Sequence, residues 1–204
     1  MKIVPLLIMI ILSGCVPKAY DTKEEAYLAI ADESSIKAFS ELEKGNWASA
    51  RKWFSDAVVG AQLGKAKPEA LAILYYEYGR TLGVVCKYDE SEFFLNKANK
   101  LDAYLKGPRY MSLVELARLS LDQKKWDKTI DYFDQAMPEL ERINVQTKAP
   151  HAYADILDEY AKALEGLNKP EATEYHQRAN DIRKKYPQGH SITDRTPYGT
   201  QCTN

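Results

Sequence analysis

Large and small apolar residues recur along the chain with the spacing of a packed helix face. Each of three aromatic residues, Trp47, Tyr88 and Trp126, is followed seven positions later by a large apolar residue and three positions after that by an alanine. Because residues three apart lie on one face of an α-helix, each large–small pair predicts a helix that a neighbouring helix approaches closely at the alanine. The pairs are Phe54 and Ala57, Leu95 and Ala98, and Phe133 and Ala136.

Helix start and stop signals divide the chain into eight predicted helices, arranged as four antiparallel pairs. Thr22 and Glu25 match a capping box, in which the two side chains satisfy free backbone amides at a helix start. Gly45 suits the end of that helix, and Pro68 and Pro150 suit first turns. The predicted ranges are 22–44, 47–64, 68–85, 89–102, 108–124, 126–142, 149–167 and 170–185.

The three aromatic residues lie 41 and 38 positions apart, so the pattern is an internal repeat. It resembles the tetratricopeptide repeat (TPR), although the consensus glycine occurs only as Gly45 and a fourth unit near 161–179 is weaker. The resemblance implies an all-α, TPR-like α-solenoid of about four helical hairpins stacked in a right-handed superhelix. In the second unit, the residues at the consensus positions are Tyr75, Gly79, Leu82, Cys86, Tyr88, Ser91, Leu95 and Ala98.

The first fifteen residues carry a separate signal. A basic start at Lys2 precedes the apolar stretch 3–12, which is too short to cross a bilayer. The sequence Leu-Ser-Gly-Cys at 12–15 resembles the lipobox of bacterial lipoproteins. That resemblance implies cleavage before Cys15 and its acylation, hence anchoring to a membrane. No aspartate follows the cysteine, which favours the outer membrane with the protein facing the periplasm; the alternative is an ordinary cleaved signal with an incidental cysteine.

These signals divide the chain into four predicted segments. Residues 1–14 form a lipoprotein signal peptide and residues 15–21 a lipid-anchored linker. Residues 22–186 form the TPR-like repeat domain, and residues 187–204 form an irregular tail. The tail contains Tyr198, which suits a docked rather than a free segment.

The two remaining cysteines, Cys86 and Cys202, form a possible disulfide. An even pair is consistent with a bridge in an oxidising compartment, and the tail is long enough for Cys202 to reach. The alternative is that Cys86 is simply a small, half-buried residue at a helix turn. The sequence leaves both open.

The TPR resemblance implies that certain positions of the first helix in each hairpin face a concave groove. Arg80 and Arg118 fall at equivalent positions of adjacent units, where two guanidinium groups could clamp a carboxylate or an extended peptide. The alternative is that Arg80 pairs with Glu77 or Glu115 and Arg118 with Asp122. The predicted peptide-binding groove contains Ile73, Tyr76, Arg80, Gly83, Met111, Val114, Arg118 and Leu121, with an acidic end at Asp155, Asp158 and Glu165.

Composition and motifs narrow the classes of function. The 204 residues include 28 basic and 29 acidic ones, for a net charge of −1, which argues against a nucleic-acid partner. The three histidines lie far apart in the sequence, and we find no metal-binding, phosphate-binding or nucleophile motif. We therefore expect a non-enzyme without metal or cofactor, although two carboxylates would suffice for a glycosidase.

These inferences favour a lipid-anchored adaptor that binds other cell-envelope proteins or peptides through the groove. One alternative is a protein that binds or acts on peptidoglycan, using tyrosines and carboxylates. Another is a structural lipoprotein that assembles with copies of itself. The sequence identifies neither the partner nor the oligomeric state.

Overall fold

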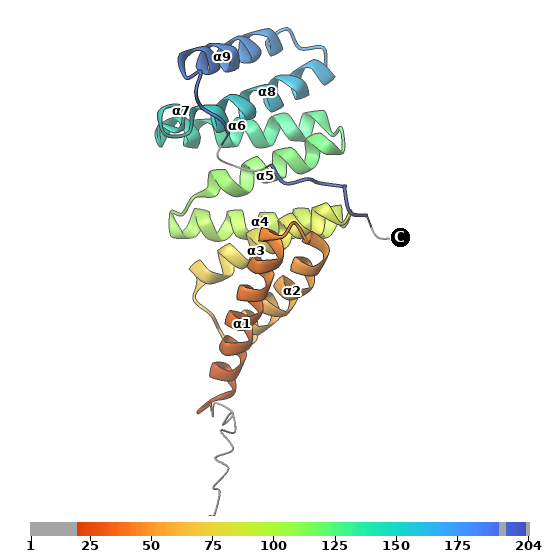
Figure 1. Cartoon of the computed structure of the whole chain (residues 1–204), viewed down its shortest axis with the longest axis vertical. Helices are drawn as coiled ribbons and strands as arrows, with labels where there is room; N and C mark the ends of the chain where they lie inside the picture. Colours follow the sequence, from red (N-terminus) through yellow and green to blue (C-terminus); the bar gives the residue numbers. More distant parts are fainter. Residues whose placement is uncertain (1–19, 192–194, 203–204) are drawn as a thin grey trace, which may run out of the picture.

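The computed structural model describes residues 20–191 and 195–202. Within these ranges the chain contains helices and turns and no strand. Figure 1 shows the helices stacked in a row, with the first hairpin at one end and the last at the other. The helices are α1 (Lys23–Glu43), α2 (Trp47–Leu63), α3 (Pro68–Val84), α4 (Tyr88–Leu105), α5 (Arg109–Asp122), α6 (Trp126–Arg142), α7 (Val145–Lys148), α8 (Pro150–Gly166) and α9 (Ala172–Lys185).

Four helical hairpins form the stack. The helices α1 and α2, α3 and α4, α5 and α6, and α8 and α9 pack together in pairs, and successive pairs touch through α2 and α3, α4 and α5, and α6 and α8. This arrangement confirms the predicted all-α, TPR-like solenoid. Two details differ from the prediction: α4 continues to Leu105, and the single turn α7 precedes α8. The four residues of α7 are too few to show a helical period.

The hairpin turns keep one backbone conformation although their sequences differ. The φ angle is +73° at Gly45, +67° at Cys86, +57° at Lys124 and +55° at Asn168. A residue other than glycine gives up roughly 1–2 kcal/mol in this left-handed region. The departures from the consensus glycine therefore add a modest strain without changing the turn.

The large–small pairs form the centre of the packing between paired helices. All six residues of the three pairs, including Phe54, Leu95 and Phe133, are completely buried. Gly79 lets α3 approach α4, because a Cβ atom there would lie 2.8 Å from Cγ of Leu95. Full burial of a leucine or phenylalanine side chain stabilises a fold by roughly 1.5–3 kcal/mol. The periodic pattern thus marks the main apolar core.

The N-terminal predictions lie outside the described residues. These are the signal peptide at 1–14, the acylation site Cys15 and most of the linker at 15–21. Among the helices that the structure describes, none is both long and apolar enough to cross a membrane. At the start of α1, the predicted capping box is present, since Glu25 donates its backbone amide to Thr22 and its carboxylate accepts from the amide of Thr22.

Candidate functional site

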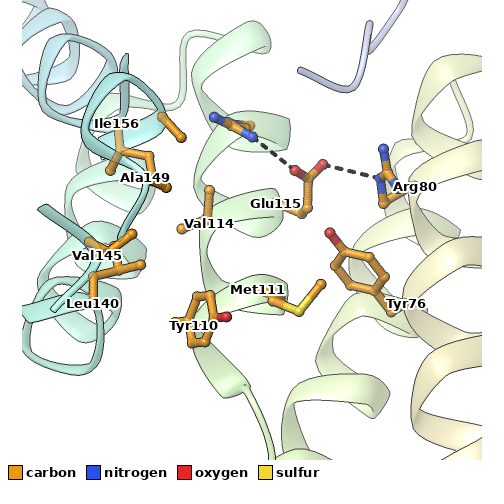
Figure 2. Close-up of a pocket in the computed structure, with 12 residues that line it drawn as sticks. Tyr76, Arg80, Tyr110, Met111, Val114, Glu115, Leu140, Val145, Ala149 and Ile156 are labelled. Carbon is orange, nitrogen blue, oxygen red and sulfur yellow. Dashed lines mark hydrogen bonds and ion pairs between the residues drawn. The ribbon is translucent and has the colours of Figure 1, made fainter. Parts of the chain in front are cut away.

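The helices α3, α5 and α8, which are the first helices of three successive hairpins, form a hollowed surface that we call the concave face. A cavity of about 440 Å³ opens between them and is closed at one side by α6 and α7. Most of its wall is apolar, and the charged groups gather at one end (Figure 2). The lining residues are Tyr76, Arg80, Tyr110, Met111, Val114, Glu115, Arg118, Leu140, Val145, Ala149, Ala152 and Ile156.

The structure brings most of the predicted groove residues together. Tyr76, Arg80, Met111, Val114 and Arg118 all line the cavity. Of the other two, Ile73 lies beside it, in a second cavity of about 350 Å³ that Tyr76 and Met111 also line. Leu121 is buried and belongs to the core cluster of the C-terminal hairpins rather than to either cavity wall.

Glu115 joins the two predicted arginines at the charged end of the cavity. Its Oε1 accepts a hydrogen bond from Nη1 of Arg118 at 3.1 Å, and its Oε2 lies 3.7 Å from Nε of Arg80. Figure 2 shows the carboxylate of Glu115 pointing towards the guanidinium group of Arg80. Only 4% of Glu115 and 6% of Arg118 is exposed. The arginines therefore face a carboxylate of this chain and not an open surface.

Further carboxylates extend this row of charges in both directions. Arg80 donates to Glu77 at 2.9 Å on α3, and Arg118 donates through Nε to Glu159 at 2.8 Å on α8. The predicted pairings of Arg80 with Glu77 and Glu115 are thus present, whereas Arg118 pairs with Glu115 and Glu159 instead of Asp122. The row alternates in sign, which compensates for the loss of hydration on burial.

The alternation of charges sets the protonation of Glu115. Burial acts to raise the pKa of its carboxyl, but the positive charges of Arg80 and Arg118 and hydrogen bonds from Thr196 and Tyr198 hold the pKa below its usual value. At Glu77 the balance is different, since burial outweighs the attraction of Arg80 and raises the pKa. Glu115 is therefore the firmly ionised centre of the row.

The C-terminal segment 195–202 docks on the same face. It runs back from the last hairpin across α5 towards α3 and α4 (Figure 1). The backbone amides of Gly199 and Gln201 donate to the carbonyl oxygens of Gly83 at 3.1 Å and Val84 at 3.0 Å. Cys202 is bonded to Cys86 in a disulfide with its Cα atoms 5.0 Å apart. The predicted irregular tail is thus held against the repeats in its described part 195–202, with a turn at Tyr198 and Gly199.

Two tail side chains enter the buried charge row. The hydroxyl of Tyr198 donates to Oε2 of Glu115 at 2.7 Å, and the hydroxyl of Thr196 accepts from Nε of Arg80 at 2.8 Å. Both tail residues are buried. The ring of Tyr198 rests on Gly83, where a Cβ atom would lie 2.4 Å from the ring. Gly83, predicted to face the groove, lines neither cavity and is covered by the chain's own tail.

Arg195 completes the row at its outer end. It donates through Nη1 and Nη2 to the two oxygens of Asp122 at 2.8 and 2.7 Å, and through Nε to Glu159 at 2.7 Å. A forked guanidinium–carboxylate pair of this kind is stronger than a single hydrogen bond and fixes direction. Asp122 is therefore occupied by the tail, which explains why Arg118 takes Glu159.

The predicted acidic end of the groove faces elsewhere. Arg183 of α9 donates to Asp155 at 2.8 Å and to Asp158 at 2.6 Å, and His176 contacts Asp158 and Glu165. These three carboxylates thus hold α9 to α8. The α8 residues on the concave face are Ala152, Ile156 and Glu159 instead. The weak fourth unit gave no reliable register for α8, and this is why the prediction selected the wrong side of the helix.

Several site residues had only a weak sequence signal. Val145 and Ala149 come from α7 and its junction with α8, where no periodicity exists. Glu115 could have been found, because it lies three residues before Arg118 on the same helix. Among the described residues, no group of three or more histidine, cysteine, aspartate or glutamate side chains is placed to hold a metal ion.

Comparison with known proteins yields similarity of structure only. No protein-family model and no curated protein matches the sequence. Two crystal structures of a kinesin light chain-type protein of Podosopora anserina with nearly identical TPR-like repeats, one of them a variant with a single substitution, superpose with TM-scores of 0.57 and 0.58. Each is 17% identical, and the match covers 78% of this chain and 77% of that one. The structure of MamA protein has a TM-score of 0.47 at 15% identity, over 81% of this chain and 98% of that one. The chain therefore has the fold of TPR-like repeat proteins.

Proposed function

We propose that this protein is a lipid-anchored adaptor that binds another protein of the bacterial cell envelope in the concave-face cavity. The observation that carries the proposal is the cavity itself, of about 440 Å³, preformed and lined mainly by apolar side chains. A site of this size accepts one or two large apolar side chains of a partner. Met111 is 38% exposed and lines both cavities, so it offers a contact that a partner can reach.

The chemistry of the wall favours a protein over a glycan. Val114, Leu140, Val145 and Ile156 present no hydrogen-bonding group, and the buried charges at the cavity's end are paired with one another. A sugar would require many polar partners to replace its lost water. An apolar side chain of a partner protein requires only the exclusion of water.

The proposed anchor rests on the lipobox-like sequence before Cys15. Acylation there would attach the chain to a membrane, and the residue that follows favours the outer membrane with the protein on the periplasmic side. Cys15→Ser should abolish incorporation of a labelled fatty acid and move the protein from the membrane fraction to the soluble one. If the labelled lipid remains after the substitution, the anchor lies elsewhere.

Crosslinking in living cells tests the adaptor function. A photo-crosslinking amino acid at position 111 or 73 should capture a discrete partner, because both side chains are exposed beside the cavities. The matched control is position 104, because Tyr104 on α4 is 82% exposed and lines neither of the two cavities. Met111→Glu, which places a charge at the cavity wall, should reduce capture from position 73 at least about tenfold. Equal capture from position 104, or capture unaffected by Met111→Glu, would contradict the proposal.

Self-assembly is the second candidate, because the first hairpin leaves large apolar side chains uncovered. Ile36 is 71% exposed, and Ile30, Phe39, Val59 and Leu63 are also exposed. Of these, Ile30, Val59 and Leu63 line one hollow of the hairpin, and exposed apolar side chains that lie together are typical of interaction sites. Light scattering over a range of concentrations would reveal dimers, and Ile36→Asp should dissolve them. A monomer at all concentrations would exclude this candidate.

A further inference from the structure

The docked tail lies on the face that the proposed function assigns to a partner. It contacts Arg80 through Thr196 and Glu115 through Tyr198, and both of these repeat residues also line the cavity. Its backbone hydrogen bonds go to carbonyl oxygens at the end of α3. The chain thus holds a segment of itself in the manner in which a bound peptide would be held.

The tail also supplies a charge that the repeats lack. Within the row, the repeats provide four carboxylates, on Glu77, Glu115, Asp122 and Glu159, and two guanidinium groups, on Arg80 and Arg118. Arg195 is the third cation, and it touches the two carboxylates at the outer end, Asp122 and Glu159. Without the tail, this end of the concave face carries an excess of negative charge, which attracts a basic partner.

The tail side chains therefore define the chemistry of a ligand. One basic residue reaches Asp122 and Glu159, a phenol three residues later reaches Glu115, and the small Gly83 receives its ring. Pro197 lies between the two and favours an extended backbone at Thr196. A turn follows, in which the amide of Thr200 donates to the carbonyl oxygen of Pro197 at 3.4 Å.

We propose that the concave face carries a binding site for a short segment with an arginine followed three residues later by a tyrosine, which residues 195–202 occupy as an intramolecular ligand. A segment of this chemistry from a partner protein takes the site when the chain's own tail leaves it. The inference rests on the proposed function in one respect only, namely that the concave face binds protein.

The geometry explains why a partner would not compete freely. The disulfide between Cys86 and Cys202 ties the far end of the tail to the turn after α3. A tethered ligand acts at an effective concentration in the millimolar range or above. A free segment therefore binds well only when the tether and the tail's own contacts are weakened.

The experiment uses the full chain and a labelled peptide, Arg-Thr-Pro-Tyr-Gly-Thr-Gln-Ser, which copies residues 195–202 with serine for Cys202. Fluorescence anisotropy compares the wild type with the variant Arg195→Ala, Tyr198→Ala, Cys86→Ser, Cys202→Ser. The variant should bind the peptide at least about tenfold more tightly than the wild type does. A control peptide with alanine for both arginine and tyrosine should bind the variant at least about tenfold more weakly, because it lacks both anchoring groups.

A second substitution locates the peptide. Asp122→Asn in the variant background should weaken binding about tenfold, since it removes the charge that the arginine of the peptide contacts.

If circular dichroism shows that the fourfold variant does not fold, the double variant Arg195→Ala, Cys202→Ser serves the same comparison. Equal binding to wild type and variant, or equal binding of the two peptides, would overturn the inference and leave a purely structural clamp. If the variant that carries only Cys202→Ser forms dimers, this result would also overturn the inference, because two copies would then be exchanging their tails.

The two proposals fail separately. If a partner is captured from position 111 in cells but no peptide binds to the purified variant, the adaptor function stands and the proposed tail-like ligand is refuted. Peptide binding without capture from position 111 would support the site on the concave face and refute the cavity as the contact with the envelope partner.

Discussion

The first hairpin and the middle of the concave face reverse the usual distribution of residues. On the first hairpin, large apolar side chains such as Ile36 and Phe39 are exposed. On α5, the charged Glu115 and Arg118 are buried, with their charges satisfied by neighbours and by the tail. Exposed apolar surface is stabilised by a partner, whereas buried charge is stable only with all its partners in place. The comparison indicates that one end of the molecule is open to association and that the middle is already occupied.

The substitution with the largest expected effect on stability removes Glu115, the centre of the charge row. Glu115→Ala should lower the free energy of unfolding by about 3–5 kcal/mol, because it leaves two buried guanidinium groups without their shared carboxylate. The matched control is Glu33→Ala on the first hairpin, whose pair with Lys37 is exposed, so that its loss should change the stability little. Urea denaturation measures both. Similar losses in the two variants would mean that the row is no more important than a surface pair.

Removing the disulfide should have the next largest effect. The bond closes a loop between residues 116 positions apart, and its loss frees the unfolded chain. Cys86→Ser with Cys202→Ser should lower the stability by about 2–4 kcal/mol. The wild type should lose a similar amount on addition of a dithiol reductant, while the double variant should not respond. A wild type that is indifferent to the reductant would show that the tail is held by its non-covalent contacts alone.

A smaller change removes only the hydroxyl of Tyr198. Tyr198→Phe keeps the ring on Gly83 but removes the hydrogen bond from the phenol to Oε2 of Glu115, and it should lower the stability by about 1.5–3 kcal/mol. Tyr104→Phe, on an exposed tyrosine, is the control and should be neutral. Thermal unfolding followed by circular dichroism gives the difference. If Tyr198→Phe is also neutral, the hydroxyl of Tyr198 does not stabilise the charge row.

The same comparison explains which features could be predicted from the sequence. The hairpins were predictable because their signals are local: Phe54 and Ala57 lie three residues apart, and a turn follows each helix. Tyr76 and Met111 were also predictable, since the repeat fixes the register of α3 and α5. The docking of Tyr198 and the bond between Cys86 and Cys202 were open possibilities in the sequence. The position of the tail on the repeats was not predictable, because its contacts join residues such as Tyr198 and Glu115, 83 positions apart, and no periodicity links them. Once Arg195 takes Asp122, the expected local partner of Arg118 is also lost.

The smallest effect comes from a charge pair outside the row, on the last hairpin. His176 of α9 is partly exposed and contacts Asp158 at 2.7 Å, and the hydrogen bond to that carboxylate raises the pKa of the imidazole above its usual value. Because the folded state binds the proton more tightly than the unfolded one, this contribution is fully present below the unfolded pKa of about 6.5 and is lost as the pH rises through the folded pKa.

The wild type should therefore lose slightly more stability than His176→Asn between about pH 6 and pH 8, by less than about 1 kcal/mol, since solvent screens an exposed pair. Urea titrations at both pH values measure the difference. Asp158→Asn should shrink the same pH dependence, although it also costs stability at every pH because Arg183 loses a partner. A pH dependence as large as the effect of Glu115→Ala would contradict the distinction between screened surface pairs and the buried row, because exposure would then no longer decide how much a charge contributes.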